Sequence, residues 1–170
     1  MTSPEPLLFD FREPDVALRF IAVDDRIMGG VSRSRLKAEA GHAAFEGELS
    51  LDAGGGFASV RSAPSPVDLT GRTGIALRVR GDGRRYRLRV RTDEHPQAVS
   101  YQAAFDAPDA SWSTVRLPFA RFEPTFRGEP RPNAKPLDPG AVSSFGLLVA
   151  DRQAGAFRLE IESITAYGSA

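Results

Sequence analysis

Two kinds of side chain in this sequence could take part in chemistry: clustered arginines and paired aspartates. Between Asp68 and Asp93 the chain carries arginines at short, regular intervals, namely Arg78, Arg80, Arg87, Arg89 and Arg91. A guanidinium group donates paired hydrogen bonds to carboxylates and phosphates, so these residues are candidates for binding an anion or the hydroxyls of a sugar. Gln102 and Arg116, on the polar side of their own expected strands, are further candidates.

The spacing of these arginines indicates the element that positions them. Apolar residues alternate with them on both sides of a Gly-Asp-Gly turn, in the order Ile75, Leu77, Val79, then Tyr86, Leu88, Val90. This period of two predicts a β-hairpin with one apolar face toward a core and all five arginines on the other face. Close like charges must be neutralised by solvent, by a bound anion or by carboxylates such as Glu160 and Glu162. The sequence leaves two interpretations of these arginines open, a structural charge ladder and a binding surface.

The aspartates lie in a second segment, Asp24–Ser34, with the sequence DDRIMGGVSRS. Its glycine pair predicts a loop with backbone at positive φ. The candidate contact residues in this loop are Asp24, Asp25, Met28, Gly29 and Gly30. Two carboxylates beside irregular backbone carbonyls could bind calcium. The alternative is that they cap turns by accepting backbone hydrogen bonds.

A third candidate segment, Ala120–Asp138, is rich in proline. We expect a long ordered loop without regular structure, of the kind that often carries binding residues. Phe126 and Arg127 are the candidate contacts within it.

No recognised catalytic set is present in the sequence. His42 and His95 fall in expected turns, without the acid and nucleophile of a hydrolytic triad. The chain has no cysteine, which excludes a thiolate nucleophile, a disulfide framework and a cysteine zinc site. We therefore expect a non-enzymatic protein without metal or cofactor. A hydrolase that uses Asp24 or Asp25 is the remaining enzymatic alternative.

The composition of the chain argues against some classes of binding partner. The formal net charge is zero, so no global field attracts nucleic acid, and the arginine pattern lacks interleaved aromatic residues for stacking on bases. No apolar run approaches the roughly 20 residues of a membrane-spanning helix. The first residues resemble neither a secretion signal nor a transit peptide. We expect a cytoplasmic protein, with at most peripheral association at the inner face of a membrane.

Short strand patterns separated by glycine and proline predict a single all-β sandwich domain over residues 1–170. The expected strands cover residues 7–11, 20–23, 45–51, 57–62, 75–80, 86–91, 100–105, 112–119, 145–151 and 156–168.

Several of these segments, in the same order, resemble a known family. They are DDRIMGGVSRS, GGGFASVRS, the arginine-rich segment, SYQAAF, WSTVRLPFARFEPTFRG and PLDPGAVSSFGLLVADRQAGAFRLEIESITAYG. From about residue 20 to 168 the chain is similar to the complex I intermediate-associated protein family, as a stand-alone bacterial-type member. The resemblance implies a galactose-binding-domain-like jelly roll. It also implies a chaperone-like role on an assembly intermediate of NADH:ubiquinone oxidoreductase, with no cofactor and no catalytic residues.

The hypothesis from sequence is therefore a non-enzymatic assembly factor for a complex I-like respiratory membrane complex. Its protein partner would contact the arginine face and the loops Asp24–Ser34 and Phe122–Asn133. The alternative is a carbohydrate- or small-ligand-binding β-sandwich module.

Overall fold

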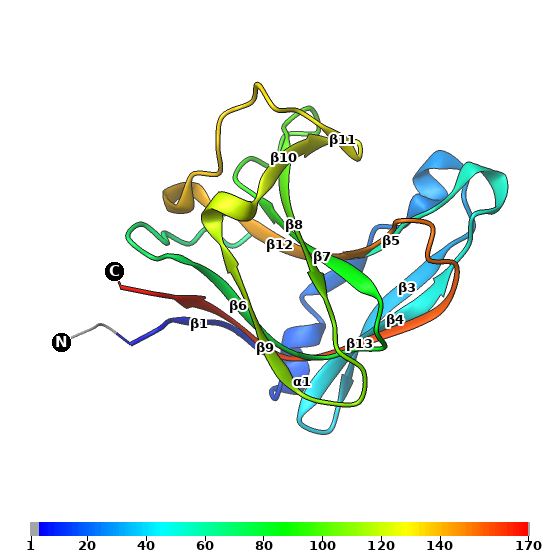
Figure 1. Ribbon diagram of the computed structural model, residues 1–170, viewed down its shortest axis with the longest axis horizontal. Coiled ribbons are helices and arrows are strands. Elements are labelled where there is room, and N and C mark those ends of the chain that lie inside the picture. The colour runs from blue at the N-terminus through cyan, green and yellow to red at the C-terminus, as the bar shows by residue number, and fades with distance from the viewer. Residues whose placement is uncertain (1–3, 170) are drawn as a thin grey trace.

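A computed structural model describes residues 4–169 as two antiparallel β-sheets packed face to face, a jelly-roll sandwich (Figure 1). This confirms the predicted all-β fold class. Sheet 1 comprises β1 (Leu7–Asp10), β3 (Arg33–Glu39), β4 (His42–Leu49), β6 (Gly74–Arg80), β9 (Ser113–Pro118) and β13 (Gly155–Tyr167). Sheet 2 comprises β2 (Phe20–Ala22), β5 (Ala58–Ser62), β7 (Arg85–Arg91), β8 (Ser100–Asp106), β10 (Glu123–Phe126), β11 (Glu129–Pro130) and β12 (Ser144–Val149).

Helical structure is limited to short segments at the ends of strands. They are α1 (Pro14–Ala17) and the 3-10 helices Asp25–Met28, Asp52–Gly54, Phe119–Arg121 and Pro139–Ala141. Within the described residues, no helix has the length and apolar character needed to cross a membrane.

The strand order fixes which side chains are neighbours. Sheet 2 runs β11-β10-β8-β7-β12-β5-β2, and sheet 1 runs β3-β4-β13-β6-β9 with β1 also paired to β13. Along β7 the apolar residues alternate inward, so that Leu88 and Val90 are fully buried opposite the apolar face of sheet 1. The polar residues between them face outward, which gives the sandwich two distinct outer surfaces.

The predicted β-hairpin over the arginine segment is wrong. Strand β6 belongs to sheet 1 and β7 to sheet 2, so the chain crosses between the sheets at Gly81–Arg84. The crossing is held by backbone hydrogen bonds from Gly81 to Pro108 (2.9 Å) and from Gly83 to Ala107 (2.9 Å). A Cβ at Gly81 would lie 2.2 Å from the Cβ of Ala107, so this close approach requires glycine. The five arginines are therefore divided between the two outer faces.

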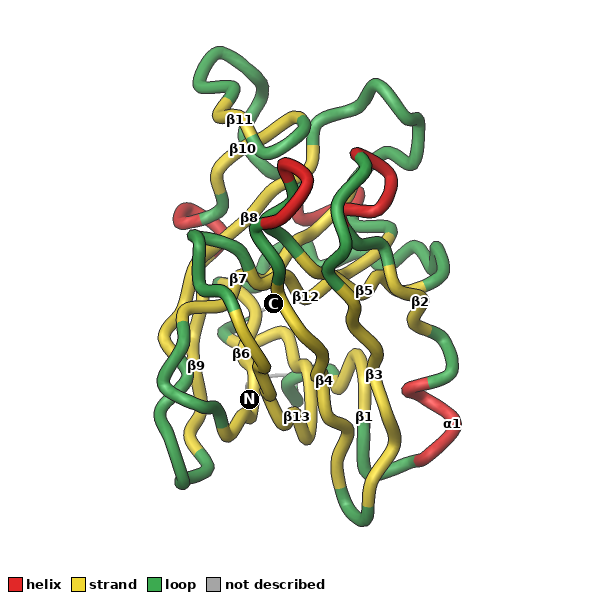
Figure 2. The backbone as a smooth tube through the Cα atoms, turned by 90° about the vertical axis from the view of Figure 1, so that its right-hand side faces the viewer, coloured by secondary structure: helices red, strands yellow, loops and turns green. Residues whose placement is uncertain are grey.

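The other strand predictions are confirmed in position, with two exceptions. The segment Ala120–Asp138 is not without regular structure, because it contains the β10–β11 hairpin. Figure 2 shows this hairpin projecting at one end of the molecule. Strand β3, from Arg33 to Glu39, was not predicted, and it extends from within the expected Asp24–Ser34 loop.

Candidate functional site

The outer face of sheet 2 gathers arginines from neighbouring strands. Arg89 of β7 lies opposite Gln102 of β8 on one side and Gly146 of β12 on the other. Gly146 in turn lies opposite Arg61 of β5. Because residues opposite one another in an antiparallel sheet share a face, these four residues form one row across four strands. Together Arg61, Arg87, Arg89 and Arg91 are called the arginine face of sheet 2 below.

A small cavity lies at the centre of this row. Its volume is about 40 Å³, and its lining includes Arg61, Arg89, Arg91 and Gly146, with Val23, Ser59, Val60, Leu147 and Leu148. Gly146 has no side chain between the two arginines that flank it, which leaves the space open. No carboxylate is among the lining residues.

The arginines of this face differ in their partners. Arg87 donates to Asp151 (2.5 Å) and to the side-chain oxygen of Gln102 (3.2 Å). The Nε atoms of Arg89 and Arg91 are buried and have no hydrogen-bond partner among the described residues 4–169. The amide nitrogen of Gln102 is also buried and without a partner there. A buried polar group in this state costs free energy unless a further acceptor satisfies it.

Burial and neighbouring charges lower the pKa values of Arg89 and Arg91. Burial, together with the charges of Arg91, Arg61 and Arg87, lowers the pKa of Arg89 to about 10. Burial also lowers the pKa of Arg91, in the same direction as the charge of Arg61, while Glu94 opposes the change. Four arginine side chains therefore concentrate positive charge on this face.

The outer face of sheet 1 has the opposite character. There Arg158 donates to Glu46 (2.7 Å), to Glu160 (3.2 Å) and to Glu39, and Arg80 donates to Glu160 (2.7 Å). This is the charge ladder that the sequence left open, formed by Arg80 and not by the arginines of β7. It lowers the pKa of Glu39, chiefly through the hydrogen bond from Arg158.

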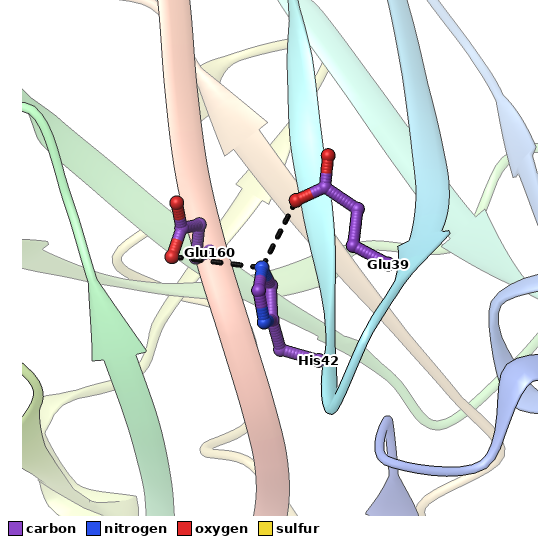
Figure 3. Close-up of side chains that lie close together, drawn as sticks. All are labelled: Glu39, His42 and Glu160. Atoms are coloured by element: carbon purple, nitrogen blue, oxygen red, sulfur yellow. Dashed lines mark hydrogen bonds and ion pairs between the residues drawn. The ribbon is translucent and has the colours of Figure 1, made fainter.

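Within this ladder, Glu39, His42 and Glu160 converge (Figure 3). The Nε2 atom of His42 lies 2.9 Å from a Glu39 oxygen and 3.6 Å from a Glu160 oxygen. Such a trio could ligate a metal ion, but both carboxylates already pair with Arg158. We interpret the cluster as part of the ion-pair network.

The remaining candidates on sheet 1 are remote from the cavity. Within residues 4–169 the side chain of Arg78 hydrogen-bonds to Thr114 alone, at 3.5 Å, and exposed Arg116 lies over the ring of Tyr167. Trp112 packs against Arg80 and His42 beside this sheet. Arg78, Arg80 and Arg116 therefore do not join the arginine face of sheet 2.

The aspartates of the Asp24–Ser34 segment serve as hydrogen-bond acceptors. Buried Asp25 accepts from the backbone and hydroxyl of Ser32 (2.9 and 2.6 Å) and from the backbone of Gly56 (2.8 Å) and Phe57 (3.3 Å). Asp24 accepts from Ser34 in the same way and from the backbone of Ser59 (3.0 Å). This geometry favours the turn-capping interpretation over calcium binding.

Gly29 and Gly30 are each needed for a different structural reason. Gly29 ends the 3-10 helix at φ 87°, in the left-handed region. A Cβ at Gly30 would lie 2.4 Å from the carboxyl carbon of Asp25, so this position must be small. The side chain of Met28 lies outside the described part of the structure.

The two candidate loops sit at opposite corners of sheet 2. The Asp24–Ser34 segment follows edge strand β2, and Val23 just before it lines the cavity. Phe126 and Arg127 lie at the tip of the β10–β11 hairpin at the other edge, with Arg127 and Arg131 packed against the ring of Phe126. The arginine face lies between these loops.

Two residues of the site were missed from the sequence. Arg61 alternates with buried Val60 and Ser62 in β5, which marks it as outward-facing. Gly146 interrupts an otherwise apolar strand. Their position beside Arg89 depends on the order β7-β12-β5, which alternation does not reveal.

Comparison with solved structures supports the fold. A family 11 carbohydrate-binding module from Clostridium thermocellum superposes with a TM-score of 0.75 at 16% identity, covering 97% of this chain and 96% of that one. A family 29 carbohydrate-binding module superposes with a TM-score of 0.56 at 8% identity, covering 96% and 84%. At these identities the likeness establishes the jelly-roll architecture alone.

Comparison of sequences identifies the family. Residues 9–161 match the model of complex I intermediate-associated protein 30. The mitochondrial proteins of that name are 28% identical to this chain in Mus musculus and 26% in Drosophila melanogaster, each over 93% of this chain. The chain spans 55% of the mouse protein and 61% of the fly protein. The chain belongs to the complex I intermediate-associated protein 30 family.

Proposed function

We propose that this protein is a non-enzymatic assembly factor that binds a protein partner, a membrane-arm intermediate of complex I or of a related respiratory complex. The observation that carries the proposal is the family match over residues 9–161. The relatives are named as proteins associated with complex I intermediates. The chain corresponds to only part of those proteins, so the identity of its partner is part of the proposal.

The surface that supports this proposal is sheet 2 with its two flanking loops. Cationic groups of Arg87 and Arg127 and the half-buried ring of Phe126 are the kinds of side chain enriched at protein interfaces. Sheet 1 is less suited to this role, because its outward charges are mostly paired with one another.

The test is affinity purification of a tagged copy at native expression from gently solubilised membranes, with the co-purifying proteins identified by mass spectrometry. We expect subunits of complex I to be recovered. The double variant Arg87→Glu and Arg127→Glu should lose them, whereas Arg116→Glu on the opposite sheet should retain them. Recovery of the protein alone would contradict the proposal. Comparing the amount of the tagged protein in the soluble and membrane fractions of the same cells tests the proposed location, cytoplasmic with peripheral attachment at the inner face of the membrane.

A carbohydrate ligand is the alternative, supported by the shared fold with carbohydrate-binding modules. The outward residues of the central strands β5, β7, β8 and β12 argue against it, because none of them is aromatic and sugar rings bind by stacking on aromatic faces. A glycan array together with a thermal-shift screen against sugars decides this point. A shift with oligosaccharide and no recovered partner would replace the assembly proposal.

A further inference from the structure

The cavity on sheet 2 is surrounded by positive charge that the protein itself does not neutralise. Arg61, Arg89 and Arg91 line it, and none of them forms an ion pair among the described residues. The Nε atoms of Arg89 and Arg91 are in addition buried without an acceptor. This arrangement stands out against sheet 1, where Arg80 and Arg158 share carboxylates.

Two carboxylates near this face are already engaged. Asp151 accepts from Arg87 at 2.5 Å. Glu94 accepts from the hydroxyls of Ser143 (3.0 Å) and Ser144 (3.0 and 3.1 Å). Neither lines the cavity, so rearranging a nearby acid would break existing contacts.

The size of the cavity limits what it can hold. One water molecule needs roughly 10–15 Å³ of such space, and the cavity measures about 40 Å³. A group of a few heavy atoms meets this limit, whereas a chain of sugar rings does not. Leu147 and Leu148 form part of the wall, and apolar surroundings strengthen charge interactions.

We propose that this cavity binds one oxyanion, a phosphate or carboxylate group, through the guanidinium groups of Arg61, Arg89 and Arg91. Each guanidinium group donates N–H hydrogen bonds to it, and the fork geometry of arginine suits two oxygens of the same group. The site does not depend on which protein partner binds the rest of the face.

The first test is isothermal titration calorimetry of the purified protein with inorganic phosphate, against sodium chloride at matched ionic strength. We expect saturable binding of phosphate at one site. Arg89→Met, which keeps an unbranched apolar stem but removes the guanidinium group, should weaken phosphate binding at least about tenfold, the loss expected for one charged hydrogen bond. Arg78→Met on sheet 1 is the matched control and should bind as the wild type does.

Thermal unfolding of the same variants separates a ligand site from a structural role. Without phosphate, Arg89→Met should be as stable as the wild type or more so, because it removes a buried charge that lacks a partner. With phosphate, the wild type should gain stability and the variant should not. Phosphate no better than chloride, an Arg89→Met variant that still binds, or a strongly destabilised variant would each overturn the proposal.

The source of the oxyanion is distinguished with the purified complex. If the partner supplies an acidic side chain, excess phosphate should release it from the wild-type protein. If a free anion occupies the cavity, phosphate should bind while the partner stays attached. Both results require the same cavity, and Arg89→Met should abolish the effect of phosphate in either case.

Discussion

Arg80 and Arg87 lie close together in the sequence but on opposite outer faces of the sandwich, where Arg80 pairs with Glu160 and Arg87 with Asp151. The chain crosses from one sheet to the other between them, at Gly81–Arg84. This crossing separates one run of arginines into a set on sheet 1, in which Arg80 is paired with a carboxylate, and a set on sheet 2, in which Arg87 is paired. The two sets should respond differently to substitution.

Arg158 should contribute measurably to stability because it bridges three carboxylates. We expect Arg158→Met to lower the free energy of unfolding by about 1 kcal/mol, since it leaves Glu39, Glu46 and Glu160 without their shared cation. The estimate is small because the side chain is 38% exposed. Urea denaturation measures the loss, which should shrink at high salt. Arg78→Met, without a carboxylate partner, should change stability by less than about 0.5 kcal/mol. Equal effects of the two changes would contradict the ladder.

Asp25 should be among the most sensitive polar positions. Asp25→Ala removes the acceptor of hydrogen bonds from Ser32, Gly56 and Phe57 and leaves their donors buried. We expect a loss of about 2–4 kcal/mol in the free energy of unfolding. Exposed Asp52 in the adjoining turn is the control, and Asp52→Ala should cost less than about 0.5 kcal/mol. A calcium site would instead make the wild type more stable with added calcium, which we do not expect.

The same carboxylate predicts a dependence of stability on pH. Burial raises the pKa of Asp25, but the hydrogen bonds from Ser32, Gly56 and Phe57 outweigh it and hold the pKa below its ordinary value. A lowered folded pKa means that the stabilisation is complete above the unfolded pKa of about 3.9 and is lost as the pH falls through the folded value. Asp25→Asn should therefore flatten the acid limb of a plot of denaturation midpoint against pH. A limb of unchanged steepness would show that other carboxylates account for it.

Gly30 and Asp25 should be energetically coupled. A methyl group at Gly30 would overlap the Asp25 carboxylate, whose carbon would lie 2.4 Å away. We expect Gly30→Ala to cost about 1–3 kcal/mol in the wild type and less in an Asp25→Ala background, where the obstructing group is gone. A double-mutant cycle by chemical denaturation measures this difference. Additive costs would mean that the glycine is needed for another reason.

The sequence identified most strands but not the sheets to which they belong. Alternation placed Leu88 in the core and Arg89 outside correctly, because that pattern depends only on the strand itself. It could not separate a hairpin from a crossing, because Gly81 and Gly83 are typical of both. Strand β3 was not predicted because Leu36 and Ala38 are the only apolar residues among the seven of this strand, too few to show an alternating pattern. The cavity could not be predicted either, because Arg61 and Arg89 lie near each other only as a result of the order of strands in sheet 2.

The crossing itself can be tested by cross-linking, because the chain has no native cysteine. Arg78 lies opposite Thr114 in sheet 1, and antiparallel partners have Cα atoms about 4.5–5.5 Å apart, within the range of a disulfide. The double variant Arg78→Cys, Thr114→Cys should oxidise readily. A hairpin with a turn at Gly81–Arg84 would instead place Arg78 opposite Arg87, so Arg78→Cys, Arg87→Cys is the matched comparison and should stay reduced. Mass shifts after mild oxidation and alkylation distinguish the two, and a disulfide between residues 78 and 87 would restore the hairpin.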